Sequence, residues 1–155
     1  MLSLEKGATN SILRSQSKPI KKFDKKLKKL VQEMIETMFK ENGVGLAAPQ
    51  IGLNLQLAVV RLNVETQQEI VLALINPQIN HLSEELVEME EGCLSLPGKW
   101  GHVKRHKSLV VTFQNEKGEK QTLALEGFNA RVIQHEFDHL KATLYLDKAT
   151  EVRDA

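Results

Sequence analysis

The sequence predicts an α+β fold with strands in the middle of the chain and a helix on either side of them. Three observations carry this prediction: an apolar stripe with helical spacing after residue 24, short branched apolar runs between residues 55 and 125, and a second helical pattern from residue 129. A length of 155 residues with 41% hydrophobic and 26% charged residues suits one compact domain. We therefore expect a single domain over residues 1–155.

The composition excludes several classes of protein. No apolar run approaches the roughly 20 residues that span a bilayer, and residues 1–6 lack the apolar stretch of a secretory signal. These features predict that the protein stays in a reducing compartment and makes no contact with a membrane. Cys93 is the sole cysteine, so an internal disulfide is excluded. Its thiol is an inert buried group, a nucleophile or a metal ligand.

Charge is distributed unevenly along the chain. Residues 1–29 contain nine lysine and arginine residues against two acids, whereas the remaining residues contain 12 basic and 18 acidic side chains. The basic segment is either a solvated face of the first helix or a surface that attracts a ribosome or nucleic acid. No aromatic residues alternate with these lysines to stack on bases, so we expect no direct readout of nucleic acid.

The first predicted helix begins after Asp24, a residue that suits the N-cap position. Its apolar stripe consists of Leu27, Leu30, Val31, Met34, Ile35 and Met38. Asn42 and Gly43 suit its end, because a residue there adopts positive φ. Residues 43–52 follow and are rich in glycine and alanine. They form either a tight connection or a loop whose backbone approaches a ligand closely.

Short apolar runs in the middle of the chain predict strands. Residues 55–62 and 70–75 are short apolar runs that we expect to pair, the second of them ending at Asn76-Pro77. Residues 108–113 and 121–125 flank a turn-rich tetrapeptide and predict a β-hairpin. Residues 91–98 resemble the end of a strand that enters a turn.

The second predicted helix covers residues 129 to about 141 and is buried on both faces. One stripe consists of Ala130, Ile133, Phe137 and Leu140. The opposite side consists of Val132, His135, Glu136 and His139. Apolar residues on both sides make a solvated helix unfavourable.

The motif His-Glu-x-x-His at residues 135–139 places two imidazoles one helical turn apart, with Glu136 beside them. This spacing predicts that His135 and His139 bind one metal ion, and the alternative is a pair of surface histidines. A catalytic centre usually has three protein ligands and an exchangeable water. Cys93 is the candidate third ligand, because it is the only soft ligand in the chain, and Glu151 is a remote alternative.

The other histidines have no partner at ligand spacing. His81, His102 and His106 are therefore predicted to be ordinary surface or strand residues.

Three segments together resemble the peptide deformylases, which remove the formyl group from the N-terminal methionine of new bacterial and organellar proteins. The segments are Gly43-Val44-Gly45-Leu46-Ala47-Ala48-Pro49-Gln50, Glu91-Gly92-Cys93-Leu94-Ser95 and Gln134-His135-Glu136-Phe137-Asp138-His139-Leu140. They occur in the family's order and at comparable separations. Weaker similarity runs from Ile12 to Asp147 and includes Asn76-Pro77 and Ala130-Arg131.

The resemblance implies antiparallel β-sheets packed around a central helix that carries the two histidines. It also implies that Cys93, His135 and His139 bind one divalent metal, with Fe(II) as the expected ion and Zn(II), Ni(II) or Co(II) as alternatives. Two supporting contacts are then expected. Asp138 and Arg105 are candidates for an ion pair, and Glu91 is a candidate for a hydrogen bond that shapes the loop.

The resemblance implies that Glu136 acts as general base and then general acid. A divalent metal lowers the pKa of its bound water to about 7, and Glu136 takes the proton of that water as it attacks the formyl carbon. The Gln50 side-chain amide and the Leu94 backbone N–H are expected to stabilise the negative charge on the former carbonyl oxygen. The products are formate and a free N-terminus.

The substrate of such an enzyme is a nascent formyl-Met peptide. We expect it to hydrogen-bond to the backbone around Gly45 as an added strand. The methionine side chain needs an apolar slot, for which the candidates are Val44, Leu94, Phe128 and Val132. The alternative is that these residues belong to the core, and for Phe128 the two interpretations are equally supported.

Two features depart from the family pattern. Ala142 occupies a position where the family usually has glycine, and if φ is positive there, alanine costs about 1 kcal/mol. The sequence also stops soon after His139, without the long C-terminal helix with which some members dock on the ribosome. The lysine-rich first helix is therefore the hypothesis for any transient contact with the ribosome.

The sequence thus predicts a metal-dependent hydrolase of N-terminal methionine processing, in the bacterial cytoplasm or in an organellar matrix or stroma. Two other hypotheses stay open. One is a metallopeptidase built on the same His-Glu-x-x-His motif. The other is a deformylase-like binding protein without turnover.

Overall fold

The computed structural model describes residues 2–154. In chain order its elements are α1 (Lys25–Lys40), β1 (Gly45–Ala47), η1 (Ala48–Ile51), β2 (Leu57–Leu62), β3 (Ile70–Asn80), β4 (Leu86–Cys93), β5 (Leu96–His106), β6 (Ser108–Gln114), β7 (Lys120–Glu126), α2 (Phe128–Leu140), η2 (Tyr145–Asp147) and β8 (Thr150–Asp154).

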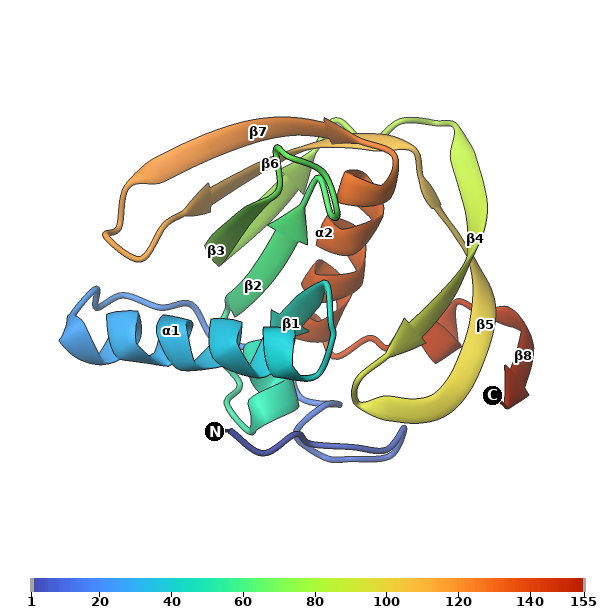
Figure 1. The fold of residues 1–155 in the computed structure, drawn as a ribbon, viewed down its shortest axis with the longest axis horizontal. Helices are drawn as coiled ribbons and strands as arrows, with labels where there is room; N and C mark the ends of the chain where they lie inside the picture. The colour runs from blue at the N-terminus through green and yellow to red at the C-terminus, as the bar shows by residue number, and fades with distance from the viewer. Residues whose placement is uncertain (1, 155) are drawn as a thin grey trace.

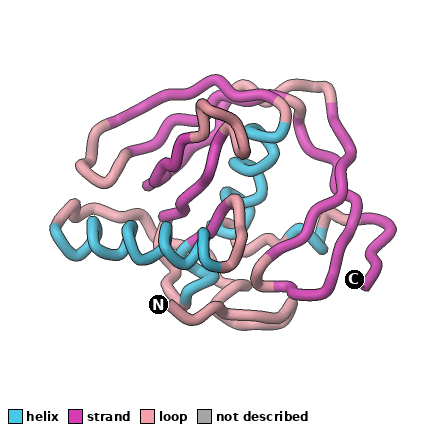
Figure 2. The backbone as a smooth tube through the Cα atoms, viewed as in Figure 1, coloured by secondary structure: helices cyan, strands magenta, loops and turns pink. Residues whose placement is uncertain are grey.

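Two antiparallel sheets lie on either side of α2 (Figures 1 and 2). In the described residues, one sheet has the strand order β1-β2-β3-β6-β7 and the other has the order β4-β5-β8. Helix α2 contacts strands of both sheets, namely β1, β2 and β7 of the first and β5 of the second. The predicted α+β class and the central helix between antiparallel sheets are therefore confirmed.

Helix α1 begins where the sequence predicts. The carboxylate of Asp24 accepts a hydrogen bond of 3.0 Å from the backbone N–H of Leu27, which satisfies one of the free donors at the helix start. The predicted apolar stripe packs onto the larger sheet. Its most buried members are Leu27, Val31, Met34 and Met38. The chain leaves the helix through Asn42, which has a φ of 58°.

The predicted end of the third strand at Asn76-Pro77 is wrong. Strand β3 pairs with β2 up to Ile75 and then continues to Asn80 along β6, with a shift of register between Ile75 and Gln78. Proline has no N–H to donate to the ladder. Asn76 adopts a φ of 51° at this point, and its amide bonds the backbone of Ile20 and the side chain of Gln114. A bulge therefore carries the strand past the proline instead of ending it.

The predicted hairpin of residues 108–125 is confirmed as β6 and β7, which pair in an unbroken register from Ser108↔Glu126 to Gln114↔Lys120. The smaller sheet was predicted only as the strand end before residue 98. Strand β5 contains Gly98, Gly101 and several charged residues, so it shows no clear apolar alternation. Its pairing with β4 and β8 is a tertiary feature.

The second predicted helix is confirmed as α2 and is buried on both faces, with Ala130 and Ile133 on one side and Val132 and Glu136 on the other. No helix of residues 2–154 is both long and apolar enough to cross a membrane.

Ala142 has a φ of 61°, the left-handed conformation that the sequence comparison with the family suggested. A β-carbon is disfavoured in this region by about 1 to 2 kcal/mol, part of which glycine loses again through its greater freedom in the unfolded chain. We expect Ala142→Gly to raise the free energy of unfolding by up to about 1 kcal/mol.

Urea unfolding of the two proteins measures this difference. Ala149→Gly is the matched control, because Ala149 has an ordinary φ and its β-carbon packs on Gly101. It should lower the stability, and equal effects of the two substitutions would contradict the proposed strain at residue 142.

Candidate metal centre

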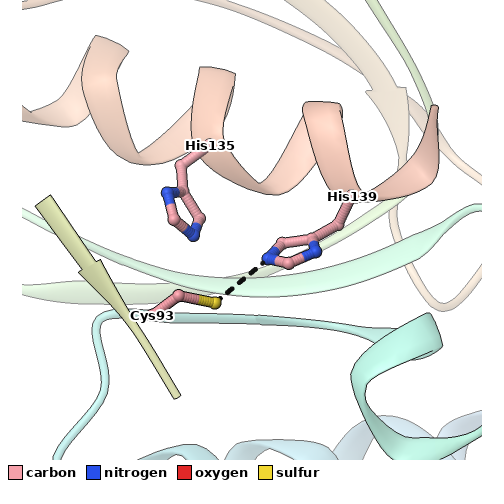
Figure 3. A group of neighbouring side chains, drawn as sticks. All are labelled: Cys93, His135 and His139. Atoms are coloured by element: carbon pink, nitrogen blue, oxygen red, sulfur yellow. Dashed lines mark hydrogen bonds between the residues drawn. The ribbon is translucent and has the colours of Figure 1, made fainter. Parts of the chain in front are cut away.

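The side chains of Cys93, His135 and His139 converge between the end of β4 and helix α2 (Figure 3). One potential ligand atom of each residue lies within 4.8 Å of the other two. The Sγ atom of Cys93 is 3.4 Å from Nε2 of His139, and the two imidazole centroids are 5.1 Å apart. This arrangement brings Cys93 together with two histidines that lie 42 and 46 positions further along the chain.

His135 is oriented by Glu91. Its Nδ1 atom lies 2.8 Å from Oε1 of Glu91. Because a carboxylate only accepts, Nδ1 carries a proton, and Nε2 is the ring nitrogen that can bind a ligand once it has lost its own proton. A histidine that donates one ring N–H to a carboxylate is the usual arrangement at protein metal sites.

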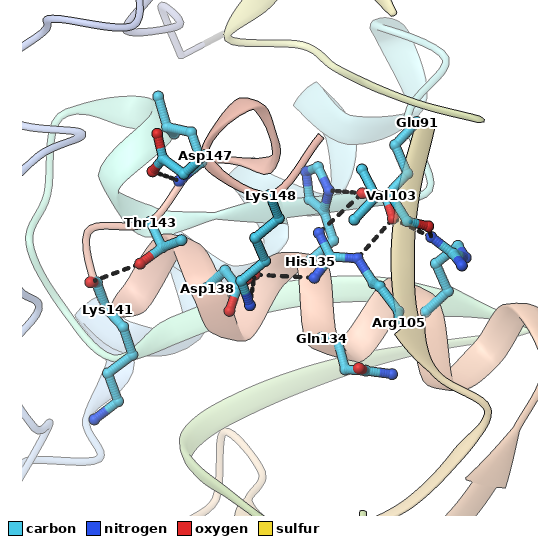
Figure 4. A network of polar contacts seen from close by, with 12 residues as sticks. Glu91, Val103, Arg105, Gln134, His135, Asp138, Lys141, Thr143, Asp147 and Lys148 are labelled. Carbon is cyan, nitrogen blue, oxygen red and sulfur yellow. Dashed lines mark hydrogen bonds and ion pairs between the residues drawn. The ribbon is translucent and has the colours of Figure 1, made fainter. Parts of the chain in front are cut away.

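Glu91 also binds two buried arginines, of which Arg105 is labelled in Figure 4. Arg105 donates to both of its carboxylate oxygens, at 2.6 and 2.9 Å, and Arg131 donates to Oε2. Burial by itself raises the pKa of Glu91, but the hydrogen bonds from His135 and Arg105 outweigh it and hold this pKa far below its usual value. Glu91 is therefore ionised. It was expected to shape the loop, but it orients a metal-ligand candidate instead.

Arg105 extends the network to Asp138, whose Oδ2 atom lies 2.9 Å from its Nη1 atom. The predicted ion pair between these two residues is confirmed. Asp138 also accepts from Lys148, at 2.9 Å. The network thus fixes α2 both at His135 and one residue before His139.

The charges of the site suit a cation. Burial and the positive charge on His135 lower the pKa of His139 well below its usual value, so this imidazole is neutral. Burial also opposes protonation of His135, yet its contacts with Cys93 and Glu91 raise its pKa well above the usual value. The site therefore favours a positive charge beside the thiol. One thiolate and two imidazoles are a donor set that binds borderline divalent metals, and the residues present fit such an ion.

Glu136 lies beside this group, and Gly45 gives it room. A β-carbon at Gly45 would overlap the Glu136 carboxylate. Burial raises the pKa of Glu136 to about 7, against the lowering effect of the charges on His135 and Arg105. Its Oε1 atom is buried, and no hydrogen-bonding group among residues 2–154 reaches it. A carboxylate in this state is suited to exchange a proton near neutral pH.

Gln50 approaches from the first turn of η1. Its Oε1 atom accepts from the backbone N–H of Ala47 at 2.9 Å, so its Nε2 atom is directed at the site. This amide donates to Ser95 Oγ at 3.1 Å and lies 3.6 Å from Cys93 Sγ. The side chain is 1% exposed, which fixes the donor in place.

A cleft of about 540 Å³ opens over the metal-ligand candidates. The structure places the remaining predicted site residues on its wall, and these are Val44, Gly45, Leu94, Phe128 and Val132. Val132 is buried, whereas Phe128 is 44% exposed. Phe128 is therefore a wall residue rather than part of the core.

Two residues of the site were missed by the sequence analysis. Arg131 was noted only as part of the resemblance, although an arginine on a helix that is buried on both faces needs an acidic partner. Tyr145, whose ring lies 6.1 Å from that of His135 at an interplanar angle of 24°, gave no comparable signal.

Comparison with known proteins agrees with this geometry. A model of the polypeptide deformylase family matches residues 6–155. The chain is 45% identical to a peptide deformylase of Synechocystis, over 90% of this chain and 74% of the relative. It is 44% identical to the chloroplastic peptide deformylase 1B of Solanum lycopersicum, over 90% of this chain and half of that protein. The crystal structure of the peptide deformylase from Thermotoga maritima superposes with a TM-score of 0.90 and 41% identity, covering 97% of this chain and 98% of the other.

The Glu91 network generates a stability prediction. Glu91→Gln leaves the guanidinium group of Arg131 buried without a counter-charge and leaves Arg105 with Asp138 alone, and we expect a loss of about 3 to 5 kcal/mol at pH 7. Because the folded-state pKa of Glu91 is lowered, its contribution is fully present above the unfolded pKa of about 4.3 and is lost as the pH falls below it.

Urea unfolding at pH 7 and at lower pH measures this difference. The two proteins should approach each other in stability only below about pH 4. Glu85→Gln is the matched control, since Glu85 pairs with Lys107 at the surface, and it should change the stability by less than about 0.5 kcal/mol. Similar losses in both variants would show that Glu91 does not hold the network.

Proposed function

The chain belongs to the peptide deformylase family, whose enzymes remove the N-terminal formyl group from nascent polypeptides, and we propose that residues 1–155 act as a single metal-dependent deformylase domain. The observation that carries this proposal is the convergence of Cys93, His135 and His139 beside the buried carboxylate of Glu136.

Cys93, His135 and His139 are the proposed metal ligands, with Glu91 holding His135 in its ligating tautomer. Peptide deformylases are metalloenzymes, and Fe(II) is the proposed ion here. Zn(II), Ni(II) and Co(II) suit the same donor set. When bound, the ion supplies a Lewis acid that polarises a carbonyl group and acidifies water.

Glu136 is the proposed general base and acid. A pKa near 7 allows its carboxylate to take a proton from the attacking water and return it to the leaving amine. Gln50 is the proposed donor to the oxygen of the formyl group as negative charge develops there, together with the backbone N–H of Leu94. Gln50 is suited to this role because its amide is already oriented by the N–H of Ala47.

The substrate is proposed to bind beside β1, an edge strand of the larger sheet in the described residues. An extended peptide can hydrogen-bond to its backbone near Gly45, whose missing side chain leaves room for the Glu136 carboxylate beside the peptide. Val44, Phe128 and Val132 line the cleft next to the metal-ligand candidates. They are the proposed apolar wall for the methionine side chain, completed by Leu94.

The proposed location is the bacterial cytoplasm or an organellar matrix or stroma, where formylated chains are made. Its support is that the relatives include bacterial and chloroplastic proteins.

Anaerobic purification with metal analysis, followed by assay of formate release from formyl-Met-Ala-Ser, tests the activity. We expect one equivalent of divalent metal and release of formate without cleavage of the peptide backbone. Cleavage of an unformylated peptide would favour a metallopeptidase instead. Binding of the formylated peptide without turnover would favour a binding protein.

Three substitutions separate the proposed roles. Cys93→Ala should lose the metal, since two imidazoles alone make an incomplete site. Gln50→Ala should keep the metal and lose about 100- to 1000-fold in kcat. Glu136→Ala should keep the metal and lose turnover. Stoichiometric metal in the Cys93 variant, or full turnover in either of the others, would contradict the assignment.

The lysine-rich face around the start of α1 is proposed to make a transient contact with the ribosome. Its exposed residues are Lys18, Lys21, Lys22, Lys25, Lys26, Lys28 and Lys29. Of these, Lys29 approaches Glu33 at 4.0 Å. A surface of this charge is attracted to the phosphate backbone of ribosomal RNA in a salt-dependent way.

Co-sedimentation with ribosomes at low and high salt tests this contact. Replacing Lys21, Lys22, Lys25 and Lys26 with serine should abolish the salt-sensitive binding. The matched control replaces four exposed lysines on β5, on β7 and on the connections next to β6, and it should retain the binding; these are Lys104, Lys107, Lys117 and Lys120. Unchanged binding in the first variant would overturn the proposal.

A further inference from the structure

The side chain of Tyr145 lies next to two of the metal-ligand candidates, His135 and Cys93. Its side chain is 1% exposed, and its ring stacks on the imidazole of His135 with 6.1 Å between centroids and 24° between planes. It belongs to a buried cluster with Leu13, Leu96 and Val103, against which Cys93 also packs. Tyr145 thus packs beside two of the three candidate ligands without being one of the residues that line the cleft.

The phenol of Tyr145 reaches a second part of the site. Its hydroxyl donates a hydrogen bond of 3.0 Å to the backbone carbonyl of Lys99. Lys99 and Trp100 line the cleft near the start of β5. The ring also packs close to Gly101, where a β-carbon would lie 3.6 Å from Cε2 of the tyrosine. One buried side chain therefore touches both a candidate ligand and the backbone of the cleft rim.

The position of Tyr145 is itself fixed from outside the site. It begins η2, at whose start Oδ2 of Asp147 accepts from the backbone N–H of Leu144 at 3.0 Å. The guanidinium group of Arg14 donates two hydrogen bonds to the same carboxylate. The N-terminal and C-terminal segments thus hold the tyrosine against α2 and β5.

We propose that Tyr145 is a positioning residue with two separable contributions: its ring holds the imidazole of His135 in place, and its hydroxyl holds the rim of the cleft at Lys99. This inference rests on the proposed function, because the rim matters only if a peptide lies in the cleft. We expect a formylated dipeptide to make fewer contacts with this rim than a longer peptide makes, since an extended chain advances about 3.3 Å per residue. The hydroxyl should therefore affect longer substrates.

Tyr145→Phe removes the hydroxyl and keeps the ring. For formyl-Met-Ala-Ser-Ala-Ala, we expect KM to rise about threefold to tenfold, the range that one neutral hydrogen bond supports. The kcat for this peptide, the KM for formyl-Met-Ala and the Kd for Zn(II) should all stay at their wild-type values. A KM that is unchanged for both substrates, or raised equally for both, would overturn the role of the hydroxyl.

Tyr145→Leu removes the ring as well. We expect its Kd for Zn(II), measured by competition with a chelator, to rise about tenfold or more, as for other residues that orient a metal ligand. A Kd equal to that of the wild type would overturn the role of the ring. If the leucine variant does not fold, the absorption spectrum of bound Co(II) in the phenylalanine variant decides instead. Because this variant keeps the ring, we expect the spectrum of the wild type. A changed spectrum would contradict the separation of the ring's role from the hydroxyl's role.

Leu13→Ala is the control for a merely structural effect, because Leu13 is fully buried in the same cluster. It should lower the thermal stability without changing the ratio of KM values or the Kd for Zn(II). A changed ratio in this variant would show that loosening the cluster is sufficient, which would overturn the assignment. Formate release by the wild-type protein tests the proposed function independently of these comparisons.

Discussion

The carboxylate of Glu91 is the contact on which the rest of the site depends. It receives Arg105, Arg131 and the Nδ1–H of His135, and so joins β4, β5 and α2 at a single buried group. Burying these charges separately would cost several kcal/mol for each ion, whereas their mutual pairing offsets that cost. Removing one member of the network would therefore leave a buried charge without full compensation. These contacts explain why α2 lies close to the smaller sheet at His135.

Helix α2 has to satisfy two requirements at once. One face packs on the larger sheet through apolar residues such as Ile133, while the other carries polar groups that are buried. The polar face is stable because its members are oriented from other elements: His135 by Glu91, and Asp138 by Arg105. Glu136 differs from them, since its Oε1 atom has no hydrogen-bonding partner among residues 2–154 and its pKa is raised to about 7. An unpaired carboxylate is costly for stability and useful for proton transfer.

The differences between prediction and structure have identifiable causes. At Asn76-Pro77 the local rule that proline ends a strand was overridden by a bulge, which positive φ at the asparagine and its side-chain hydrogen bonds make accessible. Strand β5 has too many polar and glycine residues to show an apolar alternation, and it forms because β4 and β8 flank it. Ala142 shows the opposite case: a residue type unsuited to positive φ was identified from the family pattern, and the structure has φ of 61° there.

By itself, the sequence determined the two helices, two of the strand pairs of the larger sheet (β2 with β3, and β6 with β7) and the candidate ligands. These features are local: the spacing of His135 and His139 is one helical turn, and Cys93 is the only thiol. Tertiary structure alone decided that Glu91 binds His135 and both arginines, and that Tyr145 stacks on the same imidazole. These contacts join residues at least ten positions apart through packing of separate elements, and neither periodicity nor residue type encodes which distant partner a buried charge or ring will meet.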